Sequence, residues 1–304
     1  MEPVLARLET FYDAVPRRSA AVEEHGPLRL FLPEPHAWPY YARPAAPGVV
    51  VTPDDVLAVR TRQRELGLPE ALEWVDDLVP TMSDAAARTG LTVQRCPILV
   101  LDGDPAAPPP GVRTRVLGTD DEELALAEAV AALGFGAGIG TRTGAAGAAE
   151  RDRAVSEVPV ARLTRLRELI RDGAAARVVA TLDPGADPGA DTAAARVVAA
   201  LDPRPDPAAD TAGTPPSDPA LCGPLAAGGY QRAVDVAEIV GVATLPAARR
   251  RGLGGAVAGA LARAALEAGV TTVFLSAQDD TVARVYERVG FRRVGTAGIA
   301  EPAP

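Results

Sequence analysis

Arginines and glycines gather in one short stretch near the C-terminal end of the sequence, in an order that suits phosphate binding. The stretch is Arg249, Arg250, Arg251, Gly252, Leu253, Gly254 and Gly255. It follows a β-branched segment and precedes an Ala/Leu-rich segment with the pattern of a helix. Glycines let the backbone approach a pyrophosphate, and the first amides of a helix and its dipole favour the negative charge. The stretch therefore predicts a strand, a phosphate-binding loop and a helix in succession.

A second motif follows downstream. Residues 271–276 predict a strand, and the next segment predicts a short helix that contains Tyr286 and ends at Gly290. The end of this segment, residues 285–291, reads Val-Tyr-Glu-Arg-Val-Gly-Phe. The two motifs together occupy residues 237–294.

The two motifs resemble those of the GCN5-related N-acetyltransferase (GNAT) superfamily. The Arg-x-x-Gly-x-Gly spacing is similar to its coenzyme-A loop, and residues 285–291 are similar to its Leu-Tyr-Glu-Lys-Leu-Gly-Phe signature. The resemblance implies an α/β fold with a central, mixed and twisted sheet flanked by helices, and it implies acetyl-CoA as co-substrate. It also implies that the backbone of Val242, Ala243 and Thr244 holds the pantetheine arm, while the Arg-Gly stretch holds the pyrophosphate.

The resemblance implies two catalytic residues. Tyr286 stands at the position of the family's usual general acid, which protonates the departing thiolate; the alternative is a ring that only packs on its helix. Glu238 stands where the histone-acetyltransferase branch has its general base. Half-burial in a sheet would raise its pKa toward a useful range; the alternative is an outward-facing strand carboxylate. Asp235 is a weaker candidate for the base.

Asp279 departs from the family pattern. Many members have an asparagine seven residues before the tyrosine, where this chain has Asp279. We expect this side chain near the cofactor, where it could accept a hydrogen bond but could not donate one when ionised. Its charge would be unfavourable close to phosphates, so the alternative is that it points away.

Composition excludes several classes of protein. The formal net charge of -9 argues against a nucleic-acid partner, which needs a basic face. With 2 cysteines far apart and 2 histidines, we expect no metal site and no disulfide. No stretch has the pattern of a secretory signal or of a transmembrane helix, so we expect a cytoplasmic protein without a membrane partner.

A proline-rich segment divides the sequence. Residues 104–111 predict a linker between an N-terminal α/β domain, 1–103, and a catalytic GNAT domain, 112–304. In the first of these, a helix from Thr52, a strand, a second helix and a strand at 92–101 repeat the element order of residues 253–294. The N-terminal domain is therefore either a degenerate half of a GNAT domain without the cofactor loop, or an unrelated α/β module that caps the site or forms a homodimer.

A tandem duplication lies inside the catalytic domain. Residues 174–192 are repeated almost unchanged as 193–211. One copy of Ala-Arg-Val-Val-Ala suffices for the second strand of the sheet, so we expect an Ala/Asp/Pro-rich insertion near 174–218. Residues 220–225 are expected to supply the third strand, and 236–245 the fourth.

The sequence thus predicts an acetyl-CoA-dependent N-acetyltransferase, an acyltransferase whose acceptor is an amine of a small molecule or a peptide. The alternative is a non-catalytic module that binds acyl-CoA or regulates another protein. The residues do not identify the acceptor.

Overall fold

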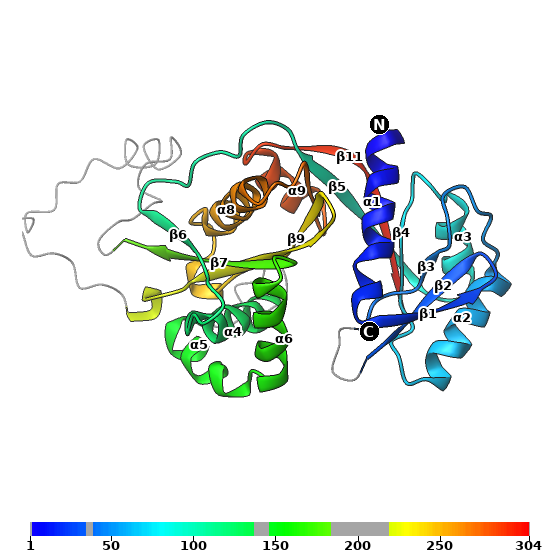
Figure 1. Cartoon of the computed structure of the whole chain (residues 1–304), viewed down its shortest axis with the longest axis horizontal. Helices are drawn as coiled ribbons and strands as arrows, with labels where there is room; N and C mark the ends of the chain where they lie inside the picture. The colour runs from blue at the N-terminus through cyan, green and yellow to red at the C-terminus, as the bar shows by residue number, and fades with distance from the viewer. Residues whose placement is uncertain (1, 35–38, 137–145, 184–218, 304) are drawn as a thin grey trace, which may run out of the picture. The chain divides into compact units, whose positions relative to one another are not determined.

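The computed structural model describes residues 2–34, 39–136, 146–183 and 219–303 of the chain (Figure 1). Contacts group the chain into two compact units. The first unit contains Met1–Asp104, Gln231–Glu238 and Ala265–Pro304, and the second contains Pro105–Tyr230 and Ile239–Ala264. The predicted domain boundary at 104–111 coincides with only one of the points at which the chain passes between units. The division into domains 1–103 and 112–304 stays a prediction.

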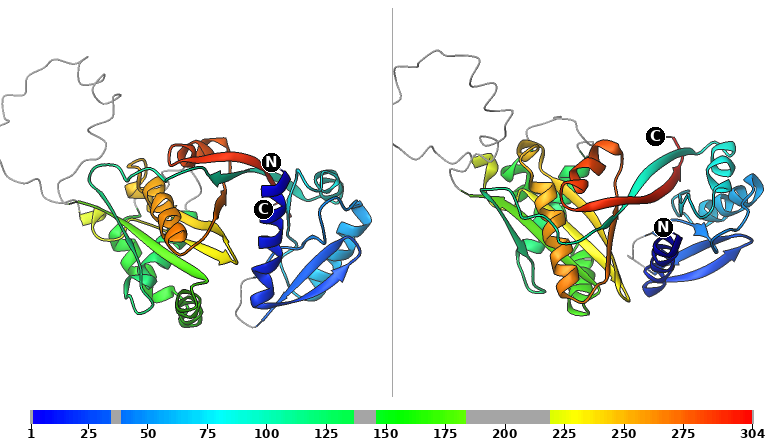
Figure 2. Two further views of the ribbon diagram at one scale, coloured as in Figure 1. Left: turned by 45° about the horizontal axis from the view of Figure 1, so that its top comes forward. Right: turned by 90° about the horizontal axis from the view of Figure 1, so that it is seen from above.

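The sheet of the first unit interleaves strands from distant parts of the sequence. Its strands are β4 (Leu72–Val75), β5 (Thr92–Leu101), β10 (Thr272–Ser276), β11 (Phe291–Glu301) and the start of β9 (Val236–Thr244). They lie in the order β4-β11-β5-β10-β9. β4 and β11, β11 and β5, and β5 and β10 are antiparallel pairs, whereas β10 and β9 are parallel. β5 and β11 run side by side along most of their length (Figure 2).

This order has an internal two-fold pattern. Helix α2 (Pro53–Glu65), β4, α3 (Thr81–Arg88) and β5 follow one another as do α8 (Leu253–Glu267), β10, α9 (Asp280–Glu287) and β11. β4 pairs with β11 as β10 pairs with β5, and β5 and β11 pair with each other at the centre. Whether the N-terminal region is a degenerate GNAT half or an unrelated α/β module stays a prediction.

Two apolar clusters hold the first unit together. One packs helix α1 (Glu2–Ala14) against the sheet through Leu5, Leu8, Phe11, Tyr12, Ile98 and Phe274. The other packs α2 and α3 against Trp74 and against a small sheet of β1 (Ala20–His25), β2 (Leu28–Pro33) and β3 (Arg43–Pro44). Helix α2 begins at the predicted place, because Thr52 and Asp55 form a reciprocal capping box.

The second unit continues from β9 through β8 (Ala226–Ala233) and β7 (Ala175–Leu182) to β6 (Val112–Val116). Helix α8 covers one face of these strands (Figure 1). The other face is covered by α4 (Glu123–Gly136), α5 (Ala148–Ala154) and α6 (Val160–Arg171). Helix α8 packs so closely on β8 that small residues are needed at the contact: a β-carbon on Gly228 of β8 would lie 2.9 Å from Val257 of α8.

One predicted element is displaced. The third strand was expected at 220–225 but is β8, at Ala226–Ala233, while 219–221 form a short 3-10 helix. Helix α6 begins only at Val160, because Pro159 separates it from a 3-10 turn at Val155–Glu157. The first copy of the duplication forms β7; the rest of the insertion predicted near 174–218 lies outside the described residues.

Candidate functional site

The Arg-Gly stretch forms a turn with two left-handed residues. After β9 a 3-10 turn, Pro246–Ala248, leads into the stretch, and α8 begins at Leu253. Arg250 has φ of 66° and Gly252 has φ of 76°. A β-carbon on Gly252 would also lie 2.8 Å from Pro109 Cγ, so glycine is required there for conformation and for space. The predicted strand, loop and helix are all present.

The arginines of the loop differ in what they contact. The guanidinium of Arg249 donates to the carbonyl of Gly134, at 2.8 Å, and to the carbonyl of Thr244, at 3.5 Å. Arg249 therefore ties the loop to the end of α4 and to the end of β9. Arg250 is exposed, and its side chain makes no hydrogen bond or ion pair within the described ranges. Its charge is available to an anion.

Strand β9 is distorted where the resemblance places the pantetheine arm. Gly241 has φ of 65° in the middle of the strand, although a β-carbon there would meet nothing within 4 Å. A left-handed glycine inside a strand is typical of a bulge, and bulges are frequent beside active sites. Val242, Ala243 and Thr244 follow it, and Gly254 of α8 packs against them, since its β-carbon would lie 3.6 Å from Thr244 Oγ1.

The loop fits the pyrophosphate of acetyl-CoA. The first amides of α8 have no partner within their own helix, as at every helix start, and three arginines directly precede this end in the sequence. Gly252 has a left-handed conformation and no β-carbon, so a phosphate can come close to the backbone there. That the loop residues and the backbone of residues 242–244 hold the co-substrate stays a prediction.

The predicted base belongs to the first unit, where it lies in a polar cluster. Glu238 Oε1 accepts a hydrogen bond from the hydroxyl of Tyr12 at 3.2 Å, and that hydroxyl is 3.4 Å from Ser276 Oγ. Burial, together with the charge of Glu73, raises the pKa of Glu238 to about 8, although Tyr12 and Arg43 oppose the shift. Glu238 is therefore half-buried with a perturbed pKa, as a general base at neutral pH requires.

The weaker candidate, Asp235, has a different environment. It forms an ion pair with Arg7 at 2.7 Å and accepts a hydrogen bond from Thr271 Oγ1 at 2.8 Å. The hydrogen bond from Thr271 and the charge of Arg7 lower the pKa of Asp235. A carboxylate stabilised in its charged form is a poor proton acceptor, so the geometry favours Glu238.

Tyr286 lies on α9 in the same unit as Glu238. Its ring packs edge-on against Phe291 with centroids 6.3 Å apart, and burial raises the pKa of Tyr286 to about 12. Within the part of the chain that the structure describes, its hydroxyl makes no hydrogen bond. The hydroxyl thus stays protonated at physiological pH and can donate to a ligand.

Asp279 caps helix α9. Its Oδ1 accepts hydrogen bonds from the amides of Thr281, at 2.7 Å, and Val282, at 2.8 Å. A carboxylate in this position satisfies otherwise unpaired amides and interacts favourably with the helix dipole. The cap explains why an aspartate is tolerated at this position, while its contact with a cofactor stays a prediction.

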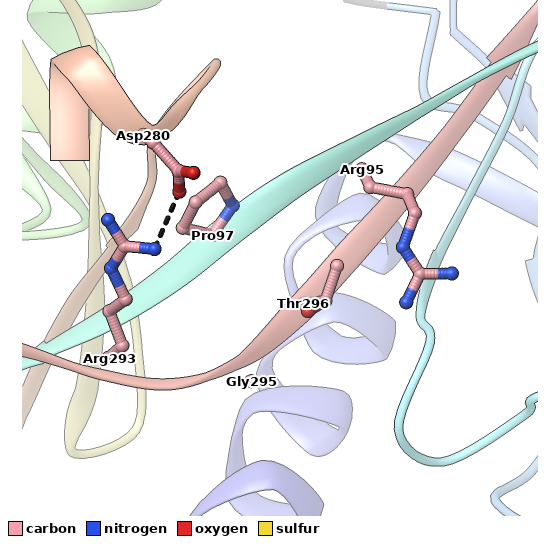
Figure 3. A pocket seen from close by; sticks show the side chains of 6 residues that line it. All are labelled: Arg95, Pro97, Asp280, Arg293, Gly295 and Thr296. Atoms are coloured by element: carbon pink, nitrogen blue, oxygen red, sulfur yellow. Dashed lines mark hydrogen bonds and ion pairs between the residues drawn. The ribbon is translucent and has the colours of Figure 1, made fainter.

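A small cavity lies beside the start of α9 and is lined by residues of the paired strands β5 and β11 (Figure 3). Its volume is about 200 Å³, and it is lined by Arg95, Pro97, Asp280, Arg293, Gly295 and Thr296. Both arginines are already in ion pairs: Arg95 with Asp76 at 2.7 Å, and Arg293 with Asp280 at 2.6 Å. None of these residues was predicted to belong to a site, and their charges are satisfied internally.

Sequence reasoning missed the residues that surround Glu238. Tyr12 comes from α1, Arg43 from β3 and Glu73 from β4. Nothing in the spacing of these residues marks them, because they lie in three different elements of the N-terminal region. Only the sheet order brings β4 and α1 into the same unit as β9.

Across the described ranges, no group of three or more His, Cys, Asp or Glu side chains is arranged to hold a metal ion. None of the helices described is both long enough and apolar enough to span a membrane.

Comparisons with known proteins agree with the fold. Residues 222–297 match the model of the FR47-like protein family. A GCN5-related N-acetyltransferase from Kribbella flavida is similar over 99% of this chain and 96% of its own, with 22% identity and a TM-score of 0.63. A putative GNAT-family acetyltransferase from Novosphingobium aromaticivorans is similar over 99% of both chains, with 16% identity and a TM-score of 0.51. The search of curated proteins found no match.

These findings confirm the resemblance and the α/β fold with a mixed sheet flanked by helices that the two motifs predicted. Residues 222–297 thus match the FR47-like family, and the chain has the fold of GCN5-related N-acetyltransferases.

Proposed function

We propose that this protein is a cytoplasmic acyltransferase that moves an acetyl group from acetyl-CoA to a primary amine of a small molecule or peptide. The observation that carries the proposal is the environment of Glu238. It is a carboxyl group with a pKa of about 8 on the strand that leads into the Arg-Gly loop. Perturbed carboxyl groups next to ligand-binding elements are characteristic of active sites.

Each residue has a distinct role in the proposed reaction. Acetyl-CoA supplies an acyl thioester that an amine can attack directly. Glu238 accepts the proton of the attacking amine, and Tyr286 donates its proton to the sulfur as negative charge develops there. The loop residues 249–255 and the backbone of residues 242–244 orient the co-substrate, which makes the attack effectively intramolecular.

The test measures cofactor binding and acetyl transfer separately. Thiol release from acetyl-CoA is followed with a panel of amines, and acetyl-CoA binding is measured by calorimetry. We expect Glu238→Gln to lose about 100-fold or more in kcat with acetyl-CoA binding retained. The matched control is Asp235→Asn, which removes a carboxylate from the same hairpin and should leave kcat nearly unchanged.

The alternative, a non-catalytic acyl-CoA-binding or regulatory module, predicts another result. In that case the wild type would bind acetyl-CoA yet release no thiol above background with any amine in the panel. Equal kcat in the wild type and Glu238→Gln would also rule out the proposed base.

A further inference from the structure

The hydroxyl of Tyr12 is the hydrogen-bond donor to Glu238, and the ring of Tyr12 is fixed from two sides. Phe274 contacts it edge-on, with centroids 5.4 Å apart and planes at 86°. The guanidinium of Arg43 lies over the ring, 4.0 Å from its centroid. Phe274 is also the register partner of Glu238 across β10 and β9, so the ring and the carboxylate rest on the same pair of strands.

Arg43 is itself held by two carboxylates. Its side chain is only 5% exposed, and it forms ion pairs with Glu73 at 2.8 Å and Glu9 at 3.3 Å. The charged and titratable groups that act on Glu238 are Tyr12 from α1, Arg43 from β3 and Glu73 from β4, while Glu9 from α1 pairs with Arg43 and Ser276 from β10 adds a neutral hydroxyl. A buried arginine that bridges two carboxylates has little freedom to move, so it makes a stable support for the tyrosine.

We propose that Tyr12, supported by Arg43 and its ion pair with Glu73, is a positioning residue that holds the Glu238 carboxylate through its hydrogen bond. This inference rests on the function proposed for Glu238. Tyr12 stabilises the ionised carboxylate because it donates to it, whereas a second carboxylate nearby repels it. Burial and the charge of Glu238 also raise the pKa of Tyr12 well above its ordinary value, so Tyr12 remains a donor throughout the titration of Glu238.

Tyr12 and Glu73 shift the pKa of Glu238 in opposite directions, so substitutions of the two residues should have opposite effects on it. In Tyr12→Phe the ionised carboxylate loses its donor, so the pKa of Glu238 should rise by on the order of one pH unit. In Glu73→Gln a repelling charge is removed, so the pKa should fall by a similar amount. At a pH below the pKa of Glu238 the first variant loses activity about tenfold, and the second loses none through ionisation.

The experiment combines two measurements on the full chain. The pH dependence of kcat is recorded with one amine for all variants, so that ionisation of the amine is common to every profile. The Glu238 carboxyl is titrated directly by NMR with carbon-13-labelled glutamate, and its signal is assigned by its absence in Glu238→Gln. Tyr41→Phe is the matched control, because Tyr41 donates its hydrogen bond to Glu301, at 2.8 Å, and not to Glu238.

Opposite shifts in Tyr12→Phe and Glu73→Gln, with no shift in Tyr41→Phe, support the proposal. Loss of activity without a change in the titration of Glu238, or shifts of the same sign, overturns it. If Tyr12→Phe does not fold, Glu73→Gln alone decides through the sign of its shift. If no amine is acetylated by the wild type, the proposed function fails, whereas the NMR titration still reports whether Tyr12 and Glu73 set the pKa of Glu238.

Discussion

Trp74 on β4 and Gly298 on β11 are register partners, and the indole occupies the place of a side chain on the glycine. A β-carbon on Gly298 would lie 2.2 Å from Cε2 and Cζ2 of Trp74. The ring is fixed in turn by a hydrogen bond from its Nε1 to Asp76 Oδ1 at 2.9 Å. Because the indole is fully buried in the cluster between α2, α3 and the sheet, it cannot move aside.

We therefore expect Gly298→Ala to lower the free energy of unfolding by about 2–4 kcal/mol, since even one methyl group overpacks this contact. Urea unfolding followed by tryptophan fluorescence measures the change. Gly118→Ala is the control, because a β-carbon there would meet nothing within 4 Å and should change stability by less than about 0.5 kcal/mol. Equal stability of the two variants would contradict the observed packing.

Substitutions of the loop arginines should affect coenzyme-A binding and protein stability to different extents. Arg250→Ala removes an exposed guanidinium, so we expect the Kd for coenzyme A to rise about 3–10-fold with little change in Tm. Arg250→Gly should weaken binding equally but stabilise the protein by up to about 1 kcal/mol, because glycine adopts the left-handed conformation freely.

Arg249→Ala makes the contrasting variant. Loss of the hydrogen bonds to Gly134 and Thr244 should lower the free energy of unfolding by about 1–2 kcal/mol. Calorimetry with coenzyme A and thermal unfolding measure both quantities. An Arg250→Ala protein that binds as tightly as the wild type would remove Arg250 from the cofactor site.

The stability of the protein should depend on pH through Glu238. Its pKa is about 8 in the folded protein against an ordinary value of 4.5, so between these values the folded state holds a proton that the unfolded state has released. The free energy of unfolding therefore falls as pH rises through this window, by at most about 1.4 kcal/mol per pH unit. Urea unfolding of the wild type and of Glu238→Gln at pH 5, 7 and 9 should show a difference that grows with pH. A constant difference would contradict the raised pKa.

Tyr286→Phe should reduce kcat by about 100-fold with little change in the KM for acetyl-CoA, because only proton donation is lost. Since burial raises the pKa of Tyr286 to about 12, its ionisation should not produce a falling limb of the wild-type pH profile in the alkaline range below that value. Steady-state kinetics with thiol detection measure both. Unchanged kcat in Tyr286→Phe would mean that water or the substrate supplies the proton.

Removal of residues 1–104 should prevent folding of the remainder. Ten register pairs join β5 to β11, and β10 also pairs with β5, so the truncated chain exposes the edges of two strands. We expect an insoluble or unfolded product, measured by solubility and circular dichroism. A truncated protein that unfolds cooperatively and binds coenzyme A would instead show that residues 112–304 form an independent domain.

The parts of the fold that depend on neighbouring residues were predictable from the sequence. The capping box of Thr52 and Asp55 and the apolar run of 92–101 gave a helix and a strand in the right places. β8 was missed because it contains Gly228 and Gly229, which have low strand propensity. These glycines are needed there for tertiary reasons: β-carbons on them would lie 2.9 Å from Val257 and 2.7 Å from the carbonyl oxygen of Ala176.

The candidate site likewise contains some residues that the sequence predicts and others that it does not. The loop and Tyr286 belong to continuous motifs and could be identified by their spacing. Tyr12 and Glu238 are 226 residues apart, and no pattern connects them. Their contact follows from the order of strands in the sheet, which is set by long-range pairing.

The interleaved order β4-β11-β5-β10 also has a consequence for synthesis of the chain on the ribosome. β4 and β5 emerge early, but β11, which lies between them in the finished sheet, emerges only after the whole second unit. Until then the two early strands present open edges, and non-native strands could pair with them. The sheet that supports Glu238 is therefore completed late, and a nascent chain that stalls before residue 291 has no route to an assembled first unit.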